Sequence, residues 1–162
     1  MTQSKNSPRV VSSAAELVQD VTVDLVGITY YRVSAELDDG LSSDDSDMGE
    51  LVPTYGLKLL SDGDEIGVRL SLTLKGDIGR VEVDIAANYT TPFPIELTED
   101  VRLSFANEVG IMTLIPYVRE TVWALTQRVF GTAIVMPVLQ RGELSFTRDG
   151  SDGTNKLASA DN

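Results

Sequence analysis

The chain has 162 residues, 42% of them hydrophobic, which suits one domain with a single core. It contains no histidine and no cysteine, which excludes Ser-His-Asp and Cys-His catalytic sites, disulfides and the usual ligands of zinc or iron–sulfur centres. Its net charge of −12 argues against nucleic-acid binding, which needs Lys and Arg to displace counterions, and favours cationic protein partners. We therefore expect no enzyme, no cofactor and no metal.

Three parts of the chain differ in composition. Residues 1–12 are polar and are expected to be disordered, residues 13–148 to form a single domain, and residues 149–162, rich in Gly, Ser, Asp and Asn, to form a disordered tail. The amino-terminal residues lack the apolar core of a signal peptide, and no apolar run approaches the roughly 20 residues that span a bilayer. We therefore expect a cytoplasmic protein with no membrane insertion.

The first predicted elements are a short helix and a strand. Ser13 and Glu16 form a capping box, which predicts a helix to about residue 20. Residues 21–33 are rich in β-branched and aromatic side chains and predict a strand, in which Gly27 marks a bulge. Residues 36–50 hold seven acidic residues and no basic one, which indicates a solvated loop. Neither this loop nor residues 62–64 fit a calcium-binding EF-hand.

The clearest pattern is a strict alternation of apolar and polar residues from 66 to 75, which gives a strand one apolar face. Residues 80–91 alternate in the same way. Turns over residues 61–64 and 75–79 join these strands to each other and to a strand over residues 55–60, so the strands are antiparallel. Because the apolar face needs a cover, we predict an α+β fold: a four-stranded antiparallel meander with a short and a long helix packed on one face.

The two helices follow in the chain. Thr98 is a helix N-cap, and a short helix is expected from there to about residue 107, with Gly110 interrupting it before the long helix. Pro116 is tolerated only in a first turn, so the long helix is expected to begin near residue 113 and to end at Gly131. Its apolar stripe comprises Ile111, Leu114, Ile115, Val118, Val122, Leu125 and Val129.

The run Leu114-Ile115-Pro116-Tyr117-Val118-Arg119-Glu120, followed by Gly131 and then Pro137-Val138, resembles the helix signature of the SecB family. The resemblance implies a meander, a crossover loop (here about residues 92–98) and a long helix, assembled as a dimer of dimers. It also implies a cytoplasmic, ATP-independent chaperone (holdase) that binds unfolded or precursor polypeptides in apolar grooves for export. Members of the family pass these clients to the SecA motor through an acidic sheet surface. Other SecB-like proteins are dedicated to one partner, such as an antitoxin.

The resemblance directs attention to three sets of residues. A client-binding groove is expected at Tyr55, Leu57, Phe93, Ile95 and Leu97, although the same residues can equally fill the core. The family's first strand carries acidic residues for the motor contact, and residues 27–31 carry none, so the docking patch is assigned to Glu82 and Asp84. Tyr31 and Trp123 are expected at a subunit interface, with client contact as the alternative.

Two function classes thus remain open from the sequence. The first is the holdase, either general or dedicated to one partner. The second is a small acidic adaptor or structural protein that shares only the layout. No phosphate-binding loop of the Gly-rich Lys-Ser/Thr type is present, so the sequence does not support ATP-driven action.

Overall fold

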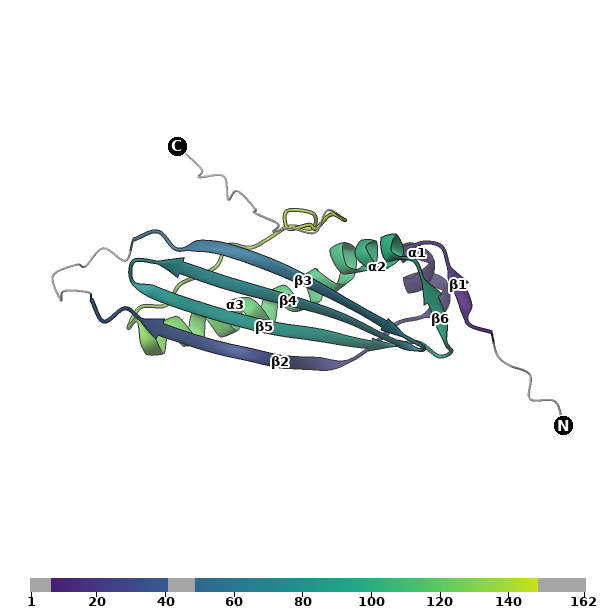
Figure 1. Ribbon diagram of the computed structural model, residues 1–162, viewed down its shortest axis with the longest axis horizontal. Helices are drawn as coiled ribbons and strands as arrows, with labels where there is room; N and C mark the ends of the chain where they lie inside the picture. The colour runs from purple at the N-terminus through teal and green to yellow at the C-terminus, as the bar shows by residue number, and fades with distance from the viewer. Residues whose placement is uncertain (1–6, 41–48, 149–162) are drawn as a thin grey trace.

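A four-stranded antiparallel sheet with a long helical segment across one face dominates the computed structural model, which describes residues 7–40 and 49–148 (Figure 1). The strands are β2 (Asp24–Leu37), β3 (Val52–Asp62), β4 (Glu65–Gly76) and β5 (Gly79–Thr90). Their order is β2-β5-β4-β3, so β3, β4 and β5 form a meander, and β2 pairs with β5 at the opposite edge from β3. The predicted α+β fold is confirmed.

The alternation in β4 and β5 gives the sheet its buried face. Its buried apolar side chains are Ile66, Val68, Leu70, Leu72, Leu74, Val81, Val83, Ile85, Ala87 and Tyr89. They face α3, whereas the polar residues between them point away from the helix. In β2, the pairing with β5 shifts between Leu25 and Gly27 and again between Tyr30 and Arg32. The first shift is the bulge expected near Gly27.

One helical segment runs without a break through α2 (Glu99–Phe105), a π-helical turn η2 (Ala106–Gly110) and α3 (Ile111–Val129). The Thr98 side chain caps it, and Gly131 follows it with a φ of 73°, both as predicted. The expected interruption at Gly110 was wrong, because this residue is helical and packs directly on Val68 of the sheet. Pro116 lies inside α3 rather than in a first turn that begins near residue 113.

A small two-stranded parallel sheet closes one end of the molecule. It pairs β1 (Arg9–Val11) with β6 (Ile95–Leu97), and the Arg9 N–H donates to the Pro94 carbonyl over 3.1 Å. The expectation of disorder over residues 1–12 was therefore wrong for β1; residues 1–6 lie outside the described residues, as does the predicted disordered tail, residues 149–162. The capping-box helix is α1 (Ala14–Glu16), continued by the π-helical turn η1 (Leu17–Val21).

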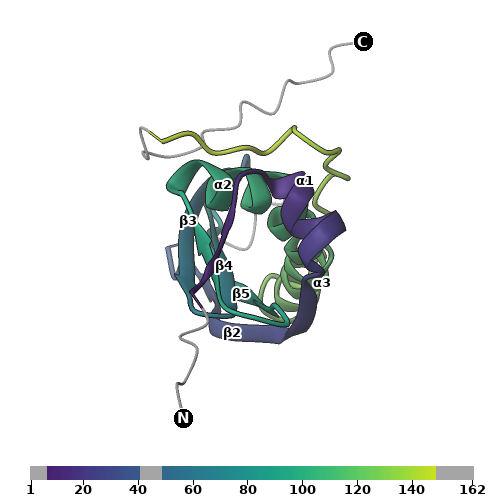
Figure 2. The same ribbon diagram turned by 90° about the vertical axis from the view of Figure 1, so that its right-hand side faces the viewer.

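The chain after α3 returns along the molecule and passes over α2, as the end-on view shows (Figure 2). It has no regular structure between Gly131 and Arg148, yet Met136, Leu139 and Leu144 are buried in the core. This arrangement places the carboxy-terminal part of the described chain beside β3 and α2, where it lines a cleft.

Candidate functional site

A cleft of about 390 Å³ lies between β3, α2 and the segment that ends at Arg148. Its apolar lining is provided by Leu57 and Leu59 of β3, Leu103 of α2, and Phe146. Gly56, Glu99, Arg102, Thr147 and Arg148 complete the wall. We name this hollow the β3–α2 cleft. The lining thus combines four apolar side chains with polar and charged groups, and such polar groups fix the orientation of a ligand in binding sites.

β3 is an edge strand of the sheet, because its only partner among the described strands is β4. An edge strand presents backbone N–H and C=O groups to which an extended peptide can add. The apolar residues Leu57 and Leu59 alternate with Lys58, so they face the helix side while Lys58 faces outward. The cleft therefore combines a free strand edge with apolar side chains on one side of it.

Arg102 brings a cation to the cleft. Its Nε is buried and has no hydrogen-bond partner among the described residues, which is costly for a polar group. Arg148, at the rim, is paired with Asp100 at 2.6 Å. Because Arg102 lines the cleft, its guanidinium is the cation that a carbonyl or carboxylate oxygen entering the cleft would meet.

The five residues expected to form a client groove do not lie together on this surface. Leu57 lines the cleft, and Phe93 is partly buried against the core. Tyr55, Ile95 and Leu97 are buried core residues, as in the alternative that the sequence left open. Burial also raises the pKa of the Tyr55 hydroxyl. A role for these five side chains in client binding stays a prediction.

Sequence reasoning missed most of the cleft lining. Leu103 and Phe146 are distant in sequence and meet only because Asn107, one helical turn after Leu103, bonds to the Phe146 backbone. No local pattern marks that contact. The apolar alternation of residues 57–59 was visible, and it is the one sequence signal that identifies this part of the site.

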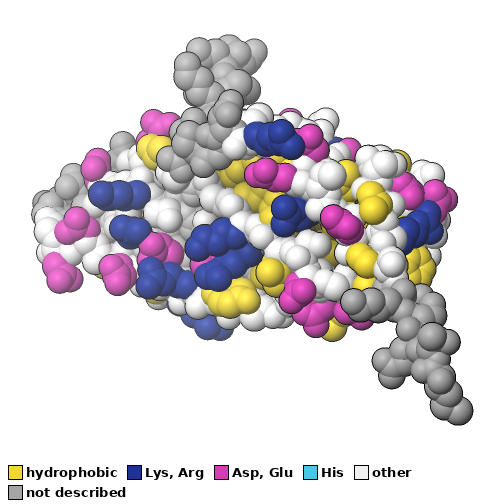
Figure 3. Space-filling view, turned by 45° about the vertical axis from the view of Figure 1, so that its right-hand side comes forward, with side chains coloured by type: hydrophobic (Ala, Val, Ile, Leu, Met, Phe, Trp, Pro, Cys, Tyr) yellow, Lys and Arg dark blue, Asp and Glu magenta, His cyan; other side chains and the backbone are white. Residues whose placement is uncertain are grey.

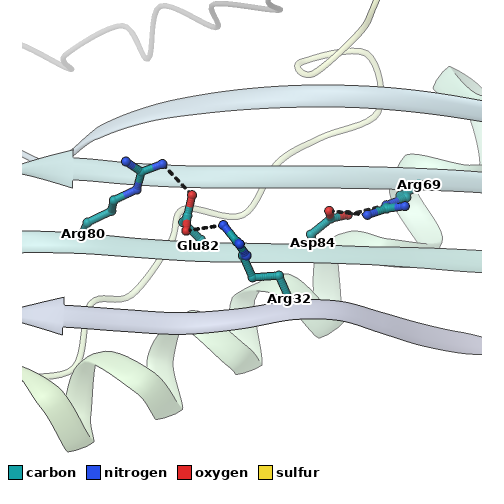
Figure 4. A network of polar contacts seen from close by, with 5 residues as sticks. All are labelled: Arg32, Arg69, Arg80, Glu82 and Asp84. Carbon is teal, nitrogen blue, oxygen red and sulfur yellow. Dashed lines mark hydrogen bonds and ion pairs between the residues drawn. The ribbon is translucent and has the colours of Figure 1, made fainter.

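The face of the sheet opposite α3 carries a network of ion pairs (Figure 4). Asp84 accepts two hydrogen bonds from Arg69, through Nε and Nη2, each 2.7 Å long. Glu82 accepts from Arg80 on its own strand and from Arg32 on β2, the latter over 3.0 Å. The Arg80 hydrogen bond is the main cause of the lowered pKa of Glu82, and Asp84 raises the pKa of Arg69.

These contacts affect the acidic docking patch that the sequence predicts at Glu82 and Asp84. Both of its residues, Glu82 and Asp84, are engaged by arginines from neighbouring strands. A cationic partner would have to compete with those arginines for the two carboxylates. A docking role for Glu82 and Asp84 stays a prediction, and the geometry supplies no free carboxylate at either position.

The two residues expected at a subunit interface are both exposed in the single chain. Trp123 of α3 is 50% exposed and lies beside Pro116 and Val135, and Tyr31 is 56% exposed. The Arg69 guanidinium lies 3.7 Å from the centre of the Tyr31 ring. Further exposed apolar side chains follow β2, the second edge strand: Leu25, Val26, Tyr30, Val33 and Leu37.

Within residues 7–40 and 49–148, no group of three or more acidic side chains is arranged to hold a metal ion. None of the helices in these ranges has the length and hydropathy needed to cross a membrane.

No protein-family model and no curated protein matches the sequence. Among solved structures, the chain is similar to a SecB-like chaperone from Mycobacterium tuberculosis in complex with a ChAD peptide from the HigA1 antitoxin, with a TM-score of 0.66 and 19% identity. The match covers 79% of this chain and 97% of that one. A protein of unknown function from Streptococcus agalactiae aligns with a TM-score of 0.44 and 8% identity over 73% of this chain and 98% of its own. The chain therefore has the SecB-like fold.

Proposed function

We propose that this protein is an ATP-independent chaperone that holds unfolded polypeptide segments in the β3–α2 cleft. The observation that carries the proposal is the cleft itself, in which an edge strand, four apolar side chains and an unpartnered guanidinium nitrogen lie together. An extended client segment adds beside β3 and places alternate side chains on Leu57, Leu59 and Leu103. Arg102 takes a carbonyl or carboxylate oxygen of the client.

The chemistry of the cleft suits holding rather than catalysis. The chain has no histidine or cysteine, and the cleft residues include no pair of side chains placed for nucleophilic attack or proton transfer. Binding rests on apolar burial, worth about 25 cal/mol per Å² of apolar surface, and on backbone hydrogen bonds. Release therefore needs only competition or refolding of the client.

Between the two kinds of holdase, we favour one dedicated to a single partner such as an antitoxin. The SecB-like chaperone with the similar fold was solved with a peptide of an antitoxin, which supports this choice. Delivery to the SecA motor for export is the alternative, and the pairing of Glu82 and Asp84 with arginines weighs against it. A pull-down from the native cell separates the two: one dominant co-purifying protein supports the dedicated role, and many precursors support export.

We further propose that the chaperone acts in the cytoplasm as a homo-oligomer, a dimer of dimers. The exposed apolar side chains along β2 and the half-exposed Trp123 supply surfaces that a second copy would cover. Trp123 is the single tryptophan of the chain and so reports on this directly. Acrylamide quenching of its fluorescence falls as the protein concentration rises if copies cover it. A constant, high quenching together with a monomeric mass would favour the adaptor alternative.

Suppression of aggregation tests the holding function. The protein at a near-stoichiometric ratio is expected to reduce light scattering by a slowly refolding client. Leu103→Glu places a charge among the apolar cleft residues and should abolish most of that protection. Val138→Glu, at an exposed position outside the cleft, is the matched control and should retain it. Unchanged scattering with the wild-type protein, or equal loss in both variants, would contradict the proposal.

A further inference from the structure

Part of the sheet face that points away from α3 carries five cations and three carboxylates, although the whole chain has a net charge of −12. Figure 3 shows Lys and Arg side chains gathered over this part of the surface. We name it the basic face; its cations are Arg32, Lys58, Arg69, Lys75 and Arg80, and its carboxylates are Glu36, Glu82 and Asp84. Three further carboxylates of the same sheet face, those of Asp24, Asp62 and Glu65, lie beyond the basic face, at the end of the sheet where a turn joins β3 to β4.

Two pairs of like charges lie on this face, and the two members of each pair are direct neighbours across adjacent strands. Lys58 lies directly opposite Arg69 across β3 and β4, and Lys75 lies directly opposite Arg80 across β4 and β5. Like charges in directly opposed positions destabilise a sheet. Lys58 and Lys75 are the only two lysines in the part of the chain that the structure describes, and neither has an ion-pair partner there. Fold stability alone does not account for this arrangement.

An apolar hollow adjoins Lys58. It has a volume of about 190 Å³, and its floor is made of the small residues Gly67 and Ala86. Tyr31 and Leu60 flank it, and both are more than half exposed, at 56% and 58%. Arg69 is held in place here by Asp84 and by the Tyr31 ring, so it does not have to be ordered when a ligand arrives.

We propose that the basic face docks an acidic polypeptide segment of a partner protein, with one carboxylate at Lys58 and another at Lys75. The charge complementarity is local, because at 0.1 M salt the Debye length of about 10 Å screens the rest of the acidic chain. Arg69, opposite Lys58, and Lys75 are six residues apart on β4, which at about 3.3 Å per residue places the two cation pairs about 20 Å apart. An extended segment with acidic residues six positions apart matches that distance.

The hollow favours a polypeptide over a nucleic acid. An aliphatic or aromatic side chain next to the first acidic residue fits beside Tyr31 and Leu60 and buries their exposed surface. This surface differs from the β3–α2 cleft, because Lys58 faces outward and the hollow and the cleft have only Leu59 in common among their lining residues. The basic face would bind an acidic partner, whereas an acidic docking patch would bind a cationic one.

Fluorescence anisotropy with defined peptides tests the proposal. The probe is a labelled, Ser/Thr-rich peptide that carries two Asp residues six positions apart and a Phe beside the first. Three peptides serve as comparisons. In two of them Asn or Lys replaces both Asp residues, and in the third the Asp residues lie three positions apart. At 0.1 M salt the six-residue Asp peptide is expected to bind about tenfold more tightly than each of them, and binding should weaken as salt rises.

Charge-reversal variants locate the binding. Lys58→Glu/Lys75→Glu is expected to lose about tenfold or more in affinity for the Asp peptide. The control Arg128→Glu/Arg141→Glu makes the same change of charge at exposed positions elsewhere and should bind as the wild type does. Thermal unfolding confirms that both variants fold. Client holding, tested by light scattering, should be unchanged in the Lys58/Lys75 variant. A failure of the docking proposal can therefore be distinguished from a failure of the holding function proposed for the cleft.

Three outcomes would overturn the proposal. The first is equal loss of affinity in the control variant, which would reflect net charge alone. The second is equal binding of the Lys or Asn peptide. The third is tighter binding of a single-stranded oligothymidylate of the same length, which would make the basic face a nucleic-acid surface.

Discussion

Asn107 and Phe146 bond to each other twice. The Phe146 backbone N–H donates to Asn107 Oδ1, and Asn107 Nδ2 donates to the Phe146 carbonyl, both over 2.9 Å. The Asn107 side chain thus gives the Phe146 backbone the two hydrogen bonds that a neighbouring strand would otherwise provide. Because Phe146 lines the β3–α2 cleft, the position of one cleft wall depends on this carboxamide.

Removing the carboxamide should release that segment. In Asn107→Leu, two hydrogen bonds worth about 0.5–1.5 kcal/mol each are lost, so trypsin cleavage at Arg141 is expected to accelerate about fivefold to a hundredfold. Asn107→Asp keeps the acceptor for the Phe146 N–H but not the donor, and should give an intermediate rate. Gln127→Leu, at an exposed amide of α3, is the control. Equal cleavage rates in all four proteins would show that the pair does not hold the segment.

Gly110→Ala should destabilise the fold. Alanine is the better helix former by about 1 kcal/mol, and Gly110 has ordinary helical dihedrals, so helix propensity alone predicts stabilisation. An added Cβ, however, would lie 2.6–2.8 Å from three carbons of Val68 and push the helix off the sheet. We expect a net loss of about 1–3 kcal/mol in urea unfolding. Gly27→Ala, where a Cβ meets open space, should be close to neutral; a stabilised Gly110→Ala would refute the close packing.

Thr126 ties the end of α3 to the chain that follows it. Its buried Oγ1 donates to the Val122 carbonyl and accepts from the Ile134 N–H, each over 2.8 Å. Thr126→Val leaves that N–H without a partner and should cost about 1–3 kcal/mol of unfolding free energy. The buried Thr121 only donates, to the Tyr117 carbonyl, so Thr121→Val should cost clearly less. Similar losses in denaturant unfolding would contradict this reading.

Glu82 should make stability depend on pH. Hydrogen bonds from Arg80, and the charge of Arg32, lower the pKa of its carboxyl in the folded state. Its contribution is therefore complete above the ordinary glutamate value of about 4.3 and is lost as the pH falls through the lower folded value. Glu82→Gln should have a lower Tm than the wild type at neutral pH, and the difference should disappear in acid. A Tm difference between Glu82→Gln and the wild type that stays constant across the pH range would argue against these ion pairs.

Local patterns predicted the local structure well. The alternation over residues 66–75 produced β4, and the caps at Ser13 and Thr98 begin helices as expected. The failures come from contacts between distant residues. Gly110 looks like a helix breaker in sequence, but its small size serves a close approach to Val68. β1 exists only because β6, far along the chain, offers it a partner.

The candidate site was harder to predict for the same reason. Of the five expected groove residues, Leu57 alone lines the cleft, because the crossover loop forms β6 and turns its apolar side chains into the core. The carboxylates of Glu82 and Asp84 were visible in one strand. Their arginine partners, except Arg80, come from neighbouring strands, and only the register brings them together. Charge counted along one strand therefore did not show that both carboxylates are paired with arginines.

The central claim is that the β3–α2 cleft holds the client, and a cross-link measures this most directly. Because the chain has no cysteine, Leu103→Cys introduces a unique thiol for a benzophenone label in the cleft, and Val138→Cys provides the same label outside it. After illumination with an unfolded client, we predict a covalent adduct at position 103, reduced by unlabelled client, and little adduct at position 138. Equal adducts at both positions, or none at position 103 while the client is bound, would contradict the account.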